Sequence, residues 1–165
     1  MESRIKVLGH PVHPMLIVYP LGLLSSAVIF DIVYLATGNP DLATFSFWAL
    51  AAGLLGGLAA AIFGLVDWLA IPKETRAKRI GAFHGAGNLV VVLLFAVSFL
   101  MRIDRAAYLP DVLPFLVAFI GAGIALVTAW LGGELVYRLR VAVDDDADLD
   151  ASNSLTREGA VDITG

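Results

Sequence analysis

Four long runs of apolar residues, separated by short polar breaks, dominate the chain. Charged residues are scarce inside these runs, so they lack the polar face of an amphipathic helix in a soluble protein. A helix rises about 1.5 Å per residue, and about 20 apolar residues therefore cross the hydrocarbon layer of a bilayer. The runs predict transmembrane helices over residues 14–37, 42–69, 81–102 and 112–137.

The breaks between the runs carry signals for helix ends. Gly38 is a candidate C-terminal cap for the first helix, and Asp41 is a candidate N-terminal cap for the second. Pro72 and Pro110 mark the other two breaks. Because the connections are short, consecutive helices should run antiparallel. We therefore expect an all-α integral membrane protein, an up-down-up-down bundle of four transmembrane helices.

The same pattern defines the domain organisation. We expect an N-terminal cytoplasmic segment over residues 1–13, a transmembrane domain over 14–143 and an acidic, disordered tail over 144–165. The tail is rich in carboxylates and poor in aromatic residues, which is typical of a solvated segment. The first run exceeds the roughly 7–15 apolar residues of a signal peptide, so we expect it to be retained. The weak similarity between the halves does not define a repeat.

Basic residues gather at one end of the predicted bundle, whereas only Arg102 and Arg105 fall at the other end. Cytoplasmic loops of membrane proteins collect Lys and Arg, so we expect both termini in the cytoplasm. The basic residues at this end are Arg4, Lys6, Lys73, Arg76, Lys78, Arg79, Arg138 and Arg140.

Composition narrows the chemistry. Charged residues make up 16% of the chain, against roughly 25% in a soluble domain. The chain contains no cysteine, which excludes disulfides, iron–sulfur ligation and thiol catalysis. No nucleophile elbow, phosphate-binding loop or metalloprotease motif is recognisable, so a redox or binding subunit is favoured over a stand-alone enzyme. The basic residues fit membrane orientation, and we expect no nucleic-acid partner.

All three histidines fall toward the cytoplasmic ends of predicted helices. His10 and His13 precede or open the first helix, and His84 lies early in the third. Asp67, near the end of the second helix, and Glu134, near the end of the fourth, reach a similar depth. Ionisable groups at membrane depth are functional candidates because lipid makes them costly. We expect these side chains to form one polar layer, supported by its neighbours Asn88, Trp68 and Tyr137.

A second polar feature lies at the outer end of the predicted bundle. Asp31 follows His13 by 18 residues, and Arg102 follows His84 by the same interval. This interval is about five helical turns, so each charge lies on the same helix face as its histidine. We expect Asp31 and Arg102 to form a structural ion pair, because an unpaired charge inside the bilayer is costly.

Two local features bear on the histidine layer. Small residues surround His84 in the segment GAFHGAGN at 81–88, which leaves room for a flat porphyrin or for a closely crossing helix. Pro20 lies inside the first helix and removes a hydrogen bond to the Leu16 carbonyl, so we expect a kink there.

Several of these motifs together resemble a known family. The chain is similar to the predicted bacterial membrane proteins grouped as domain-of-unknown-function family 2231, over roughly residues 5–143. The resemblance implies a bacterial cytoplasmic (inner) membrane location, and it implies a redox setting because some members are joined to Rieske-type iron–sulfur domains. The motifs that carry it are GHPVHP at 9–14, YPLG at 19–22, GLVDW at 64–68, His84 with Asn88, and GGELVY at 132–137.

Three functions remain open at this point. The first is a b-type haem electron-transfer subunit, in which His84 and either His10 or His13 are axial ligands. The second is a non-haem site for Fe, Zn, Cu or Mn, with the three histidines, Asp67 and Glu134 as ligands. The third is a structural or partner-binding subunit whose polar layer holds the helices together. The expected partners are the lipid bilayer, a redox partner protein and a second copy of the chain.

Overall fold

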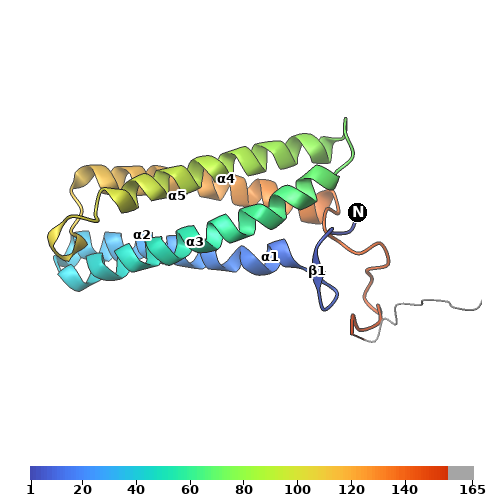
Figure 1. Cartoon of the computed structure of the whole chain (residues 1–165), viewed down its shortest axis with the longest axis horizontal. Helices are drawn as coiled ribbons and strands as arrows, with labels where there is room; N and C mark the ends of the chain where they lie inside the picture. Colours follow the sequence, from blue (N-terminus) through green and yellow to red (C-terminus); the bar gives the residue numbers. More distant parts are fainter. Residues whose placement is uncertain (156–165) are drawn as a thin grey trace, which may run out of the picture.

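The structure is a computed structural model, and it describes residues 1–155. Its helices lie side by side in an elongated bundle (Figure 1). All four predicted spans are confirmed as helices long and apolar enough to cross a membrane. The helices are α1 (Val12–Leu16), α2 (Val18–Thr37), α3 (Pro40–Ala70), α4 (Arg76–Leu100) and α5 (Val112–Gly133), with α1 and α2 together forming the first span.

The third span is shifted toward the N-terminus relative to its predicted bounds. Helix α4 begins at Arg76 rather than at residue 81, because the Thr75 side chain caps it by accepting from the Lys78 amide. The apolar pattern misses these first turns because they carry basic residues. The helix ends at Leu100, so Arg102 lies in the turn after the helix and not on its last turn.

The first span is interrupted close to Pro20, at Ile17, and the predicted kink stays a prediction. Helix α1 ends at Leu16 and α2 begins at Val18, with Ile17 between them. The Ile17 amide donates to the His13 carbonyl at 3.1 Å, and the Leu21 amide donates to the Ile17 carbonyl at 3.0 Å. Pro20 has no N–H to offer the intervening Leu16 carbonyl. The break therefore lies directly after the turn that carries His13.

The core of the bundle lies where α2, α3, α4 and α5 meet. Leu24, Leu50, Phe95 and Ala118 are buried in one cluster there. Large apolar side chains on the outer faces are exposed, as Leu55 at 69% and Leu126 at 75% illustrate. Lipid is the solvent that such surfaces require, because monomeric soluble proteins rarely expose contiguous apolar surface of this extent.

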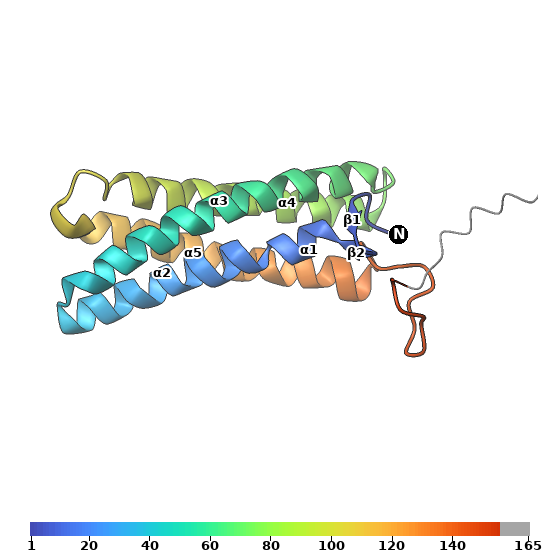
Figure 2. The ribbon, with the colours of Figure 1, turned by 60° about the horizontal axis from the view of Figure 1, so that its bottom comes forward.

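A short hairpin and the start of the acidic tail cover the end of the bundle where the N-terminus lies (Figure 2). Strand β1 (Lys6–Val7) pairs antiparallel with β2 (His10–Pro11) through a two-residue turn. Lys6 bridges Glu2 and Asp144, which ties the hairpin to the tail. The prediction of disorder stays a prediction, and the part of the tail at 156–165 lies outside the described residues.

The contact between hairpin and tail should depend on pH. Hydrogen bonds from Lys6 and then from the Asp145 amide of the tail lower the pKa of Glu2, and a hydrogen bond to Asp144 raises the pKa of Lys6. A lowered carboxyl pKa means that the contact is intact above the ordinary Glu range and is lost as pH falls through the lowered value. A raised amine pKa means that it is lost again as pH rises through the raised Lys6 value.

Spin labels on Leu8→Cys and Leu155→Cys test this expectation, because both leucines are exposed and the chain has no other cysteine. The distance distribution between the labels should be narrow near neutral pH and should broaden as the solution is acidified below the ordinary pKa range of Glu. Lys6→Gln should broaden it at neutral pH as well. A distribution that stays narrow in both cases would contradict the expectation.

Candidate functional site

His13 is held by the backbone of the neighbouring helix. Its Nδ1 lies 2.9 Å from the Ala60 carbonyl oxygen of α3, so the neutral ring carries its proton on Nδ1 and donates it there. Gly64 lies one turn further along α3, and a Cβ at that position would be 2.8 Å from His13 Cε1. The imidazole therefore occupies the space that the missing side chain of Gly64 leaves.

His84 makes the same contact in the second half of the chain. Its Nδ1 lies 2.8 Å from the Thr128 carbonyl oxygen of α5. Gly132, one turn beyond Thr128, faces the ring, and a Cβ there would be 3.0 Å from His84 Cε1. An imidazole, a helix carbonyl and a glycine four residues later thus recur in both antiparallel helix pairs. The halves show no repeat in sequence, yet they repeat this unit in structure.

The two imidazoles differ at Nε2. The Asn88 side-chain amide lies 3.1 Å from His84 Nε2, and Asn88 Oδ1 accepts from the Thr128 hydroxyl at 2.9 Å. Asn88 therefore contacts the histidine that it was predicted to support. Within residues 1–155, His13 Nε2 has no hydrogen-bond partner. In both rings, fixing the proton on Nδ1 leaves Nε2 as the atom with a lone pair.

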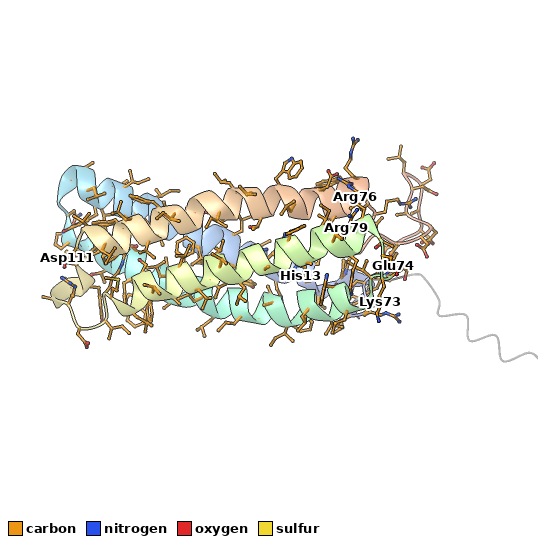
Figure 3. The ribbon with its side chains drawn as sticks, turned by 90° about the horizontal axis from the view of Figure 1, so that it is seen from above. His13, Lys73, Glu74, Arg76, Arg79 and Asp111 are labelled. Carbon is orange, nitrogen blue, oxygen red and sulfur yellow. The ribbon has the colours of Figure 1, made fainter. Side chains whose placement is uncertain are left out.

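The two histidines come from helices on opposite corners of the bundle. Contacts run from α1 to α3, from α3 to α4 and from α4 to α5, so α1 and α4 lie diagonally across from each other. His13 lies at the half of the bundle that also carries Lys73 and Arg76, away from Asp111 (Figure 3). The structure places His13 on α1 and His84 on α4, and their convergence on one site stays a prediction.

The structure leaves the rest of the predicted layer apart from these two rings. Asp67 accepts from the Ser3 hydroxyl at 2.8 and 2.9 Å and from the Arg4 amide, so it anchors the N-terminal segment. Glu134 pairs with Arg76. Among residues 1–155, no three His, Asp or Glu side chains are grouped so that they could hold a metal ion. The two carboxylates are instead bound by other partners, Asp67 by the N-terminal segment and Glu134 by Arg76.

His10, Trp68 and Tyr137 also lie apart from the imidazole pair. His10 belongs to the hairpin and is exposed, with Nε2 3.4 Å from the Ser154 hydroxyl. The Trp68 indole donates to the Lys78 carbonyl at 3.1 Å, and Tyr137 is 86% exposed. Tyr137 belongs to η2 (Glu134–Arg138), a π-helical turn that the sequence pattern did not predict.

The ion pair at the other end of the bundle is present as predicted. Arg102 binds Asp31 through two parallel hydrogen bonds of 2.8 and 2.7 Å, and both side chains are fully buried. Ser46 and Ser98 accept further hydrogen bonds from Arg102 at 3.1 and 3.0 Å. Sequence reasoning missed both serines. Ser98 lies one helical turn before Arg102, which is a signal that could have identified it.

The comparisons with known proteins bear on this arrangement. Residues 9–145 match the family described as predicted membrane protein (DUF2231). The chain belongs to this family. The DUF2231 match includes His10, His13, His84 and the four spanning helices up to the π-helical turn. Comparisons with curated proteins and with solved structures found no match. The chain is thus an integral multi-pass membrane protein of a family whose description names no activity.

Proposed function

We propose that His13 and His84 would hold a b-type haem through Nε2 and that the protein is an electron-transfer subunit. The observation that carries the proposal is the anchoring of both rings through Nδ1, at 2.9 and 2.8 Å from helix carbonyls. Metal-ligating histidines usually donate their other ring N–H to such a group, which fixes the tautomer and leaves Nε2 for the metal. Diagonally opposed helices suit ligands that approach one cofactor from two sides.

The contacts of the carboxylates favour haem over a bare divalent ion. Asp67 is bound by Ser3 and Arg4, and Glu134 is paired with Arg76. A divalent ion held by two neutral imidazoles alone would lack ligands and charge compensation. A porphyrin supplies four nitrogens of its own and needs only the two imidazoles.

Binding requires one local change at His84. The Asn88 amide must release His84 Nε2, which a rotation of the Asn88 side chain achieves while the Thr128 hydroxyl remains available to Asn88. When bound, haem supplies one-electron chemistry. His13 and His84 would hold the group through their Nε2 atoms, and their Nδ1 contacts would keep both rings oriented for it. The positive-inside pattern supports a cytoplasmic-membrane location with both termini in the cytoplasm.

The optical spectrum of the detergent-purified full-length protein, expressed with haem supplied, tests the proposal together with metal analysis. We expect a Soret band in the wild-type protein and none in His13→Ala or His84→Ala. His10→Ala is the matched control and should keep the band, because His10 is exposed on the hairpin. A stoichiometric transition metal without a Soret band would establish the divalent-metal alternative. If the purified protein contains neither haem nor a transition metal, the haem proposal is wrong. The two imidazole–carbonyl contacts would then be structural links between helices.

A further inference from the structure

One exposed face of α4 combines basic residues at its start with an apolar strip below them. Arg79, Phe83, Ala86 and Val90 follow one another at helical spacing, and all four are exposed. Phe83 is 68% exposed and Val90 is 44% exposed. We call these four residues the α4 strip. It lies on a different side of the helix from His84, which contacts α5.

The basic end of the strip has cations without an ion-pair partner among residues 1–155. Lys73, Arg76 and Arg79 gather at one end of the bundle (Figure 3). Arg76 pairs with Glu134, and the Lys78 ammonium turns back to donate to the Trp68 carbonyl. In the part of the chain that the structure describes, Lys73 and Arg79 have no ion-pair partner. Glu74 adds one negative charge in the same turn.

The length of the strip matches one leaflet. Arg79 and Val90 are 11 residues apart, which is about 16 Å along a helix and about half of the roughly 30 Å hydrocarbon core. Ala86 and the neighbouring Gly85 present little bulk, and a Cβ added at Gly85 would meet nothing within 4 Å. An extended acyl chain can therefore lie along the strip while its headgroup reaches the cations.

We propose that the α4 strip, with Lys73, binds an anionic phospholipid of the leaflet at the basic end of the bundle. Lys73 and Arg79 contact the phosphate, and Phe83, Ala86 and Val90 contact an acyl chain. The unpaired cations select an anionic headgroup, because a zwitterionic lipid carries its own counter-charge. Basic residues near an anionic membrane surface each contribute about 1 kcal/mol, which corresponds to about a fivefold change in affinity.

Native mass spectrometry of the detergent-purified full chain, titrated with phosphatidylglycerol or phosphatidylcholine, tests this proposal. The wild-type protein should retain phosphatidylglycerol in preference to phosphatidylcholine. Arg79→Gln and Lys73→Gln should each weaken phosphatidylglycerol binding by about fivefold. Arg105→Gln is the matched control, because Arg105 lies at the other end of the bundle and pairs with Asp111. That substitution should leave phosphatidylglycerol binding unchanged.

Glu74→Gln provides a test that misfolding cannot imitate. Removing this negative charge should strengthen phosphatidylglycerol binding, whereas a damaged protein would bind less. Equal retention of the two lipids by the wild-type protein would overturn the proposal. So would phosphatidylglycerol affinities that are the same in wild type, Arg79→Gln and Glu74→Gln.

Discussion

Replacing Arg102 with methionine is expected to lower the free energy of unfolding by about 3–5 kcal/mol. Asp31 would then stay fully buried, without the two hydrogen bonds of 2.8 and 2.7 Å that Arg102 donates to its carboxylate. The Ser46 and Ser98 hydroxyls would lose the same donor. Equilibrium unfolding in detergent micelles measures the loss. Asp31→Leu should be similarly destabilising, because it leaves a buried guanidinium unpaired.

The double variant Asp31→Leu, Arg102→Met separates two quantities. One is the destabilisation caused by leaving one buried charge unpaired, and the other is the net contribution of the ion pair to the free energy of unfolding. It should recover most of the lost stability, because replacing a buried ion pair with apolar residues is often neutral. Arg105→Met is the matched control. It removes an ion pair with Asp111 whose side chains are 41% and 65% exposed, so it should change stability by less than about 1 kcal/mol. Strictly additive losses in the double variant would contradict a coupled pair.

Gly64→Ala is expected to destabilise the protein by about 1–3 kcal/mol, the range for overpacking a tight contact. Its Cβ would lie 2.8 Å from His13 Cε1 and 3.0 Å from Nδ1, so the ring must move away from the Ala60 carbonyl. Gly132→Ala should cost less, because its nearest contact, with His84 Cε1, is 3.0 Å. Thermal unfolding in the same detergent would order the two variants.

Gly85→Ala is the control for the glycine substitutions. A Cβ there meets nothing within 4 Å, and alanine favours a helix over glycine by roughly 0.5–1 kcal/mol. This variant should therefore be neutral or slightly more stable than wild type. Equal effects at Gly64 and Gly85 would show that the imidazole does not need the space beside Gly64. If the haem proposal holds, Gly64→Ala should also weaken the Soret band, because it displaces His13.

The spacing of charges along the chain anticipated the ion pair correctly. Asp31 and Arg102 each follow a histidine by 18 residues, and the structure joins them. The pair forms because buried charges in a bilayer must be satisfied within the protein, although Arg102 lies in the turn after α4 and not on the helix face that the interval assumed. The prediction of a common depth for Asp67 and Glu134 was of less use. Depth follows from position in a span, whereas the direction of a side chain depends on how each helix packs.

The glycines near His84 also show which features follow from the sequence and which depend on helix packing. The small residues around His84 in the sequence indicated open space beside that imidazole, but Gly85 faces open space and Gly81 faces Trp68. The glycine that faces His84 is Gly132, which belongs to α5. Such a contact depends on the register between two helices, and that register is not encoded in either apolar pattern alone.

The sequence by itself determined the four spans, their antiparallel order and the end at which basic residues gather, because membrane thickness and the cost of buried charge act on each segment separately. Only the tertiary structure decided which carbonyl each imidazole contacts and which residues bind the carboxylates of Asp67 and Glu134. Those choices depend on helix rotation and on the π-helical turn at Glu134–Arg138, which are set by packing between segments far apart in the chain.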